Sequence, residues 1–129
     1  MGAPKELRYT KTHEWVRLDG DVATIGVSDY AQTELGDITF IELPEVGDSV
    51  SKNQPFGVVE SVKAASDVYA PVDGEVVERN DAVVDAPELV NSSPYEEAWL
   101  VKVKLSDPSQ VDELLDADAY DAFAATATH

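Results

Sequence analysis

Residues 57–71 read G-V-V-E-S-V-K-A-A-S-D-V-Y-A-P, and the rest of the chain is organised around this stretch. Two short apolar runs of β type, residues 58–59 and 68–70, flank a polar segment of small residues with Lys63 near its middle. Valine and tyrosine favour a pleated surface, whereas serine and alanine do not crowd a tight bend. We therefore expect a β-hairpin whose tip projects Lys63 into solvent, as a long flexible amine that can be modified and can then swing.

The segments on either side of this hairpin predict further antiparallel strands. Asp19-Gly20 lies between two β-rich runs, residues 15–18 and 22–26, and an Asp-Gly pair supplies the positive φ angles of a two-residue turn. Residues 99–105 alternate between apolar and lysine side chains, which is the period-2 pattern of a half-buried strand. Asp73-Gly74 is a second tight turn. Further strands are expected at residues 7–10, 37–43 and 75–78, with a loop or short edge strand at residues 50–55.

Short helices are expected outside these strands. Residues 28–36 change period, with an Asp29-x-x-Gln32 capping pattern at the start and Gly36 as the closing residue. Asp107-Pro108 begins a second helix, and a third is expected at residues 119–123. The segment 80–97 carries several turn formers and is expected to be mostly loop. These patterns predict a mainly β (α+β) fold, a flattened barrel or sandwich of two antiparallel sheets with one helix after the first hairpin and others at the C-terminus.

Length and charge restrict the classes of function. A chain of 129 residues is near the commonest domain size, so we expect one domain with its core at residues 7–123 and a frayed tail at residues 124–129. The formal net charge of −17 repels phosphate backbones and anionic lipids, so no nucleic-acid or membrane partner is expected. The same charge either steers the chain toward basic docking patches or reflects a generally acidic proteome. The absence of cysteine excludes disulfides and thiolate catalysis.

The sequence also carries an expectation about location. No apolar run approaches the length of a membrane span, and the first residues have no signal-peptide h-region. We therefore expect a monomeric, cytoplasmic protein of bacterial type. A mature mitochondrial chain whose transit peptide has been removed would look the same.

Lys63 has an ordinary alternative interpretation, because most exposed lysines only keep a protein soluble. Three features favour a specific role: a bend of small residues, no aliphatic neighbour bulkier than Val62, and flanking acids at Glu60 and Asp67. A metal site is not expected, because His13 and His129 are the only histidines and lie far apart.

Several motifs, in linked order, resemble the glycine cleavage system H protein family. The motifs are T-H-E-W-V at 12–16, A-T-I-G-V-S-D-Y-A-Q at 23–32, L-G-D-I-T-F-I-E-L-P at 35–44, G-V-V-E-S-V-K-A-A-S-D-V-Y-A-P-V-D-G-E-V at 57–76, N-S-S-P-Y at 91–95 and W-L-V-K-V-K-L at 99–105. They span nearly the whole chain. One departure is Ala98, where the family usually has glycine, and the tail after Phe123 matches no motif of the family.

The resemblance implies a lipoyl-type β-sandwich that carries lipoate in amide linkage on Lys63 and is not itself an enzyme. It implies that glycine dehydrogenase (decarboxylating) loads an aminomethyl group, that aminomethyltransferase unloads it, and that dihydrolipoamide dehydrogenase reoxidises the dithiol. A lipoylating enzyme is the fourth partner. Glu60 and Asp67 are candidates for recognition by these enzymes. The family further points to a cleft between residues 12–14 and the lysine hairpin, where Glu14, Thr12 and Asp67 would shelter the loaded arm, although Glu14 and Asp67 are equally well read as solvated surface acids.

Other classes of protein remain open at this point. A biotinyl carrier typically has methionines beside the lysine, whereas Val62 and Ala64 stand here. A lipoyl domain of a 2-oxoacid dehydrogenase would normally continue into a linker and a catalytic domain. A lipoyl relay that donates lipoate to other proteins would have the same sequence features. A small acid hydrolase is the enzymatic alternative, but Ser61 and Ser66 have no histidine in a plausible context for a triad.

Overall fold

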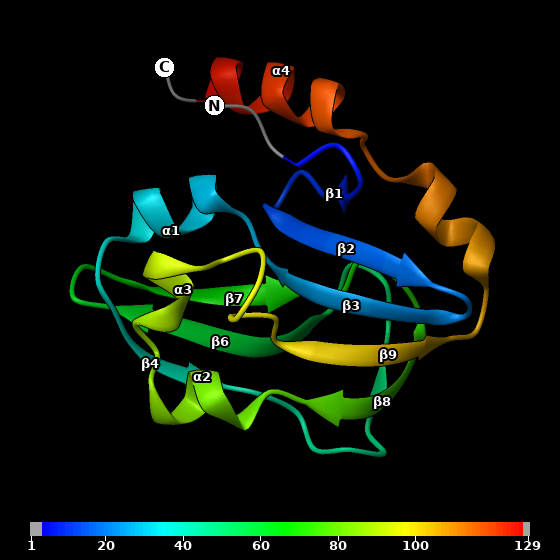
Figure 1. Ribbon diagram of the computed structural model, residues 1–129, viewed down its shortest axis with the longest axis horizontal. Helices are drawn as coiled ribbons and strands as arrows, with labels where there is room; N and C mark the ends of the chain where they lie inside the picture. The colour runs from blue at the N-terminus through cyan, green and yellow to red at the C-terminus, as the bar shows by residue number, and fades with distance from the viewer. Residues whose placement is uncertain (1–3, 128–129) are drawn as a thin grey trace.

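The computed structural model describes residues 4–127, which form two antiparallel sheets with short helices (Figure 1). The larger sheet has six strands in the order β1-β2-β3-β9-β8-β5, and the smaller has three in the order β4-β6-β7. The strands are β1 Arg8–Tyr9, β2 Glu14–Asp19, β3 Val22–Val27, β4 Ile38–Glu42, β5 Ser49–Val50, β6 Pro55–Ser61, β7 Ala65–Tyr69, β8 Gly74–Arg79 and β9 Val101–Leu105. The predicted two-sheet, mainly β fold is confirmed, and the sheets form an open sandwich instead of a closed barrel.

The core lies between the two sheets and extends beyond them at one end. One cluster centres on the middle strands of the larger sheet, with Ile25, Val101 and Val103 fully buried. A second cluster joins residues of the smaller sheet, such as Ile41 and Val59, to the larger sheet and to two short helices. Burying each such aliphatic side chain stabilises the fold by about 1.5–3 kcal/mol relative to exposure. The alternation predicted for residues 99–105 is confirmed for β9, residues 101–105, where both valines face this core and Lys104 faces solvent. Residues 99–100 precede the strand, and Leu100 is fully buried instead of sharing the solvent face with the lysines.

The first hairpin forms as expected, with its turn displaced by one residue. β2 pairs with β3 in a register that places Asp19 opposite Val22, so Gly20 and Asp21 are the two turn residues. Gly20 has a φ of 65°, in the left-handed region that glycine adopts without strain. The predicted turn at Asp19-Gly20 was therefore wrong by one position, because the strand pairing extends through Asp19.

The helices differ from the predictions at their ends. α1 Asp29–Leu35 forms where expected and closes at Gly36, but its N-cap is Ser28, whose Oγ accepts the Ala31 N–H at 3.2 Å. The prediction of Asp29 as the cap was wrong because serine one residue earlier already supplies the acceptor. The predicted helix at Asp107-Pro108 is the 3₁₀ helix η1 Pro108–Glu113. α4 Ala117–Ala127 is longer than the predicted 119–123 and extends into the expected tail at 124–129, of which residues 128–129 lie outside the described chain.

Two short helices occupy the segment that was expected to be mostly loop. α2 Asp81–Asp85 begins after Asn80, whose Oδ1 accepts the Ala82 N–H, and α3 Leu89–Ser92 follows it. Each places one valine, Val83 or Val90, completely inside the core. Helices of this length are marginal on their own and form because of such packing, so local sequence patterns did not reveal them.

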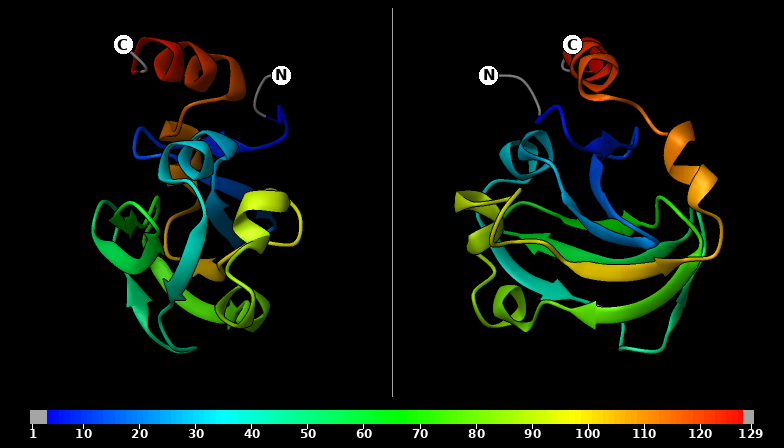
Figure 2. Two further views of the ribbon diagram at one scale, coloured as in Figure 1. Left: turned by 90° about the vertical axis from the view of Figure 1, so that its left-hand side faces the viewer. Right: turned by 45° about the vertical axis from the view of Figure 1, so that its right-hand side comes forward.

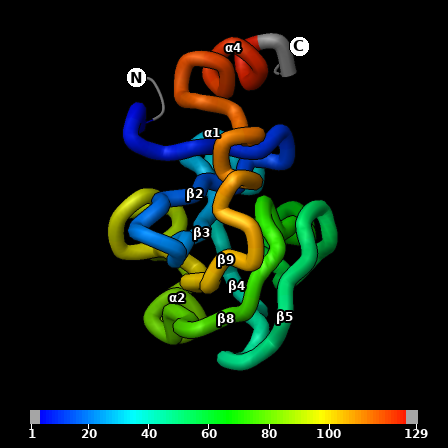
Figure 3. The backbone as a smooth tube through the Cα atoms, turned by 90° about the vertical axis from the view of Figure 1, so that its right-hand side faces the viewer, coloured from blue at the N-terminus to red at the C-terminus, as the bar shows by residue number. Residues whose placement is uncertain are grey.

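α4 and the chain that leads to it cover one end of the molecule. From β9 the chain passes through η1 and reaches α4, which lies beyond β1 in each view (Figures 2 and 3). Tyr120 of α4 stacks on Tyr9 of β1 with ring centroids 4.6 Å apart. The two ends of the described chain are therefore packed on each other, away from the hairpin that carries Lys63 (Figure 1).

Candidate functional site

Lys63 lies at the tip of the hairpin formed by β6 and β7, on the left of Figure 1. The two strands pair up to Glu60 opposite Ala65, and the Ser61 N–H donates to the Ala64 carbonyl at 2.7 Å to close the turn. Lys63 and both of its neighbours are exposed. The hairpin predicted from residues 57–71 is confirmed, with the lysine at its end.

The side chain of Ser61 organises this tip. Its Oγ accepts the Lys63 N–H at 3.2 Å and the Ala64 N–H at 3.1 Å, and it lies 3.2 Å from the Ala64 carbonyl, to which it donates. Serine hydroxyls commonly form hydrogen bonds with nearby backbone groups in this way, and these groups would otherwise bond to water. These hydrogen bonds restrict the backbone around Lys63, whereas the lysine side chain extends from it into solvent.

The tip also rests on the turn between α1 and β4. The Val62 N–H donates to the Asp37 carbonyl at 3.1 Å. Gly36, with a φ of 80°, lies under the lysine side chain, since a Cβ at position 36 would be 3.2 Å from Lys63 Cε. Among the ion pairs of residues 4–127, none involves the Lys63 amine. The amine is thus available for covalent modification, and the rest of the lysine side chain lies against Gly36.

Glu60 and Asp67, the predicted recognition acids, lie on the outer face of the three-stranded sheet. Val59 and Val68 point into the core, so the adjacent Glu60 and Asp67 point outward, and both are exposed. Neither carboxylate makes an ion pair with Lys63 in the described part of the chain. The acids therefore mark the surface that leads to the tip, and they do not neutralise the amine itself.

Glu14, the predicted shelter residue, is buried at the other end of the hairpin. Its carboxylate is 1% exposed and accepts the hydroxyls of Thr10, at 2.6 Å, and of Thr12 on Oε1. Oε2 accepts the Tyr69 N–H at 3.2 Å, which joins the start of β2 to the end of β7. Burial raises the pKa of Glu14 above its usual range, and these hydrogen bonds oppose that shift.

The structure therefore brings together only part of the predicted cleft. Thr12 and Glu14 are in direct contact, and Glu14 reaches the base of the hairpin at Tyr69. Lys63 lies six residues before Tyr69, which at about 3.3 Å per residue is roughly 20 Å along the strand. Asp67 is two residues from Tyr69 and faces solvent. An arm attached to Lys63 would have to fold back along β7 to meet the Glu14 carboxylate.

A buried polar chain around His13 was not found from the sequence. His13 Nδ1 lies 2.8 Å from Tyr120 Oη, which in turn lies 2.6 Å from Ser28 Oγ. Burial lowers the pKa of His13, and Glu34 partly opposes this. The sequence carried no signal for a partner of His13 that lies 107 residues away. This chain links β2, α1 and α4 and lies apart from the lysine tip.

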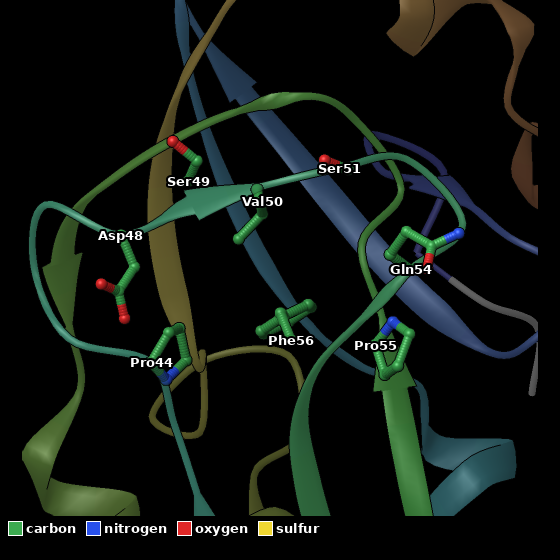
Figure 4. A pocket seen from close by; sticks show the side chains of 8 residues that line it. All are labelled: Pro44, Asp48, Ser49, Val50, Ser51, Gln54, Pro55 and Phe56. Atoms are coloured by element: carbon green, nitrogen blue, oxygen red, sulfur yellow. The ribbon is translucent and has the colours of Figure 1, made fainter.

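One open groove of about 360 Å³ lies at the base of β6, at the opposite end of that strand from Lys63 (Figure 4). Its walls include Pro44, Val50 and Phe56. Its only carboxylate, Asp48, already accepts the Glu45 N–H at 2.9 Å and so serves a turn. Within residues 4–127 there is no group of three or more His, Cys, Asp or Glu side chains that could hold a metal ion. These observations leave the lysine tip as the candidate site.

The comparisons with known proteins agree with one another. The glycine cleavage H-protein family matches residues 7–127. The glycine cleavage system H protein of Geobacillus kaustophilus is 60% identical over 122 residues, which cover 95% of this chain and 96% of that protein. That of Staphylococcus carnosus is 59% identical over 120 residues, covering 93% and 95%. The crystal structure of a glycine cleavage system H protein from Mycobacterium marinum superposes with a TM-score of 0.85 at 37% identity, covering 98% of this chain and 99% of that one.

Proposed function

The chain belongs to the glycine cleavage H-protein family, and from this premise we propose that it is the lipoyl-carrying shuttle of the glycine cleavage system, with Lys63 as the attachment point. The observation that carries the proposal is one exposed lysine at the tip of a rigid hairpin, in a chain that matches the family over residues 7–127. The family match favours this function over a lipoyl relay, a biotinyl carrier or a 2-oxoacid dehydrogenase carrier.

The residues at the tip fit lipoate. An amide to a carboxylic acid needs an accessible primary amine, and Lys63 is exposed and forms no ion pair within the described residues. When bound, lipoate supplies a disulfide that takes up the aminomethyl group of glycine and a dithiol that is later reoxidised. The chain itself contributes a fixed turn, so that only the attached side chain swings. Tethering keeps the cargo at an effective concentration on the order of mM near each docked enzyme.

We assign the partners from the reactions that the shuttle must serve. Glycine dehydrogenase (decarboxylating) loads the carrier, aminomethyltransferase unloads it, dihydrolipoamide dehydrogenase restores the disulfide, and a lipoylating enzyme attaches the group. The carrier catalyses none of these steps. Glu60 and Asp67, which share the outer face of the small sheet next to the tip, supply the charge that these enzymes recognise. The bacterial relatives support a cytoplasmic location, and we propose that the chain works as a monomer. None of the helices described is long and apolar enough to cross a membrane.

We retain Glu14, Thr12 and Asp67 as the residues that shelter a loaded amine. The Glu14 carboxylate is held by two threonine hydroxyls and the Tyr69 N–H at the base of the hairpin, where its negative charge would attract a cationic amine. Comparing how long Glu14→Gln and wild-type carriers keep their cargo tests this role, and an unchanged lifetime would contradict it.

Intact-mass measurement tests the main proposal. After expression with lipoate supplied, the chain should gain the mass of one lipoic acid less one water, and peptide mapping should place it on Lys63. Lys63→Arg should remove the adduct and all shuttle activity. Lys104→Arg, at an exposed lysine on β9, is the matched control and should retain both. A wild-type chain without the adduct would contradict the proposal, and so would a Lys63→Arg carrier that remains active.

A further inference from the structure

The turn between α1 and β4, residues 36–37, is the seat on which the lysine tip rests. The backbone carbonyl of Asp37 accepts the Val62 N–H at 3.1 Å, and the Lys63 side chain lies against Gly36, with its Cε 3.2 Å from where a Cβ at position 36 would be. The position of the lysine in space therefore depends on where this turn is held. The hairpin alone does not determine it.

Asn91 of α3 holds that turn on both sides. Its Oδ1 accepts the Ile38 N–H at 2.9 Å, at the start of β4. Its Nδ2 donates to the Gly36 carbonyl at 2.8 Å, directly after α1, and to Gln32 Oε1 at 2.9 Å, within α1. One amide side chain thereby fastens α1, the turn and β4 to α3. Asn91 opens the N-S-S-P-Y motif at residues 91–95, to which the proposed shuttle chemistry assigns no role.

The turn benefits from such an anchor because α1 packs on the core through half-buried side chains alone. The helix has seven residues and none of them is fully buried. Only asparagine among the residues of this size offers one acceptor and two donors in a plane. An aspartate would keep the bond from Ile38 and lose both donors, so it would face the Gly36 carbonyl and the Gln32 side-chain oxygen with its own negative charge.

We propose that Asn91 is a positioning residue for the lipoylation of Lys63, acting through Gly36 and Asp37 to present the amine to the lipoylating enzyme. The inference rests on the proposed function. In that step the Lys63 amine loses one proton and bonds to the carbonyl carbon of an activated lipoyl donor, whose leaving group departs with the electron pair of the broken bond. Asn91 does not contact the reacting atoms, and its only effect on the reaction is on the position of the Lys63 amine.

The chain contains a matched control for this asparagine. Asn80 also accepts one backbone N–H on Oδ1, from Ala82, and also makes two Nδ2 donations, to the carbonyls of Glu97 and Trp99. Asn80→Asp and Asn91→Asp thus delete the same number of bonds and add the same charge. Only Asn91 is connected to the seat of Lys63.

The experiment measures attachment of lipoate to the purified, unmodified chain by a lipoylating enzyme with ATP and lipoate, followed by intact mass. The kcat/KM for lipoylation is proportional to the fraction of molecules whose tip is in the position that the enzyme accepts. If Asn91→Asp lowers that fraction to about one tenth, kcat/KM should fall about tenfold. Asn80→Asp should stay within about twofold of wild type. Hydrogen exchange of the Val62 amide should accelerate in Asn91→Asp alone. Equal rates in the two variants, or an unchanged Val62 amide, would overturn the proposal.

A second pair of variants tests the seat directly if Asn91→Asp does not fold. Gly36→Ala places a methyl group against the Lys63 stem, whereas Gly20→Ala meets nothing within 4 Å; both positions have a positive φ, 80° and 65°. We expect Gly36→Ala to lower the lipoylation rate several-fold more than Gly20→Ala, and equal rates would again contradict the inference. A wild-type chain that takes no lipoate would instead refute the proposed function, so the two failures are distinguishable.

Discussion

The lysine tip, residues 61–64, and the tyrosine seam, defined as Tyr9, His13, Ser28 and Tyr120, are built in opposite ways. The tip is exposed and held by backbone hydrogen bonds and one serine hydroxyl. The seam is held by a stacked aromatic pair and a chain of buried polar groups. Side chains at the seam pack within the fold, whereas those of residues 62–64 at the tip are exposed to solvent.

The difference shows how a carrier separates stability from recognition. A buried hydroxyl or imidazole that loses its partner costs stability, because the group left behind has no water to bond with. An exposed acid or lysine has water as an alternative partner, so replacing it changes stability little. Substitutions at the tip should therefore alter modification and leave folding intact, and substitutions at the seam should do the reverse. Four predictions test this comparison.

The largest effect is expected at Tyr120. Tyr120→Leu removes the stack on Tyr9 and both hydroxyl contacts, and should lower the free energy of unfolding by about 3 kcal/mol. Tyr120→Phe keeps the stack and should cost only about 1–2 kcal/mol. Urea unfolding followed by fluorescence measures both, with Lys63→Arg as the reference at the tip, which should stay within about 0.5 kcal/mol of wild type. A loss for Tyr120→Leu no larger than that reference would break the comparison.

Glu14 should make stability fall as pH rises. Burial raises the pKa of its carboxyl above the ordinary value of 4.5, so between that value and the native pKa the folded state binds more protons than the unfolded state. Wild-type stability relative to Glu14→Gln should thus decrease as pH increases through this window and then level off. Chemical denaturation at several pH values gives the slope. A rising slope would show that the hydrogen bonds of Glu14 outweigh its desolvation.

His13 should have the opposite, smaller effect. Burial lowers its pKa below the ordinary value of 6.5 despite Glu34, so as pH falls below 6.5 the unfolded state takes up the proton first and stability decreases. His13→Asn, which tolerates the positive φ of 75° at this position, should flatten that part of the pH profile. Thermal melts between neutral and mildly acidic pH provide the measurement, and an unchanged profile in the variant would exclude His13 as the cause.

The smallest change in stability is expected for the acids beside the tip. Glu60→Gln and Asp67→Asn should each stay within about 0.5 kcal/mol of wild type, because both side chains are exposed. Their effect should appear instead as slower lipoylation, measured by intact mass over time. Glu113→Gln, an exposed acid on η1, serves as a control and should leave that rate unchanged. If either variant lowered the free energy of unfolding and left the lipoylation rate unchanged, the tip would be stabilising the fold, which is the role assigned to the tyrosine seam.

Local patterns predicted the parts of the fold that local physics decides. The strands of the Lys63 hairpin and β9 followed from β-branched runs and alternation, and Gly36 from the need for a positive φ at a helix end. α2 and α3 were missed because four- and five-residue helices exist only through the burial of Val83 and Val90. The contact between His13 and Tyr120 depends on how distant segments meet, for which a single sequence gives no signal.

The candidate site was predicted unevenly for the same reason. The place of Lys63 at a hairpin tip was confirmed, since it depends on neighbours in sequence. The seat beneath it was not foreseen, because it joins Gly36, Val62 and Asn91 from three separate segments. The cleft was expected between residues 12–14 and the lysine hairpin, and the Glu14 carboxylate does bond to that hairpin, at Tyr69, which is at the opposite end of β7 from Lys63.

The bond from the Tyr69 N–H to Glu14 bears on how the carrier leaves its partners. β7 is the last strand of its sheet, and an edge strand with free N–H groups invites another chain to pair with it. Glu14 occupies one of those donors from within the molecule, and Asp67 adds a charge beside it on the same strand. Both features reduce the backbone of β7 that is open to pairing with a strand of another chain. If the chain works as the proposed shuttle, an edge strand that is protected in this way would favour brief contacts with each enzyme.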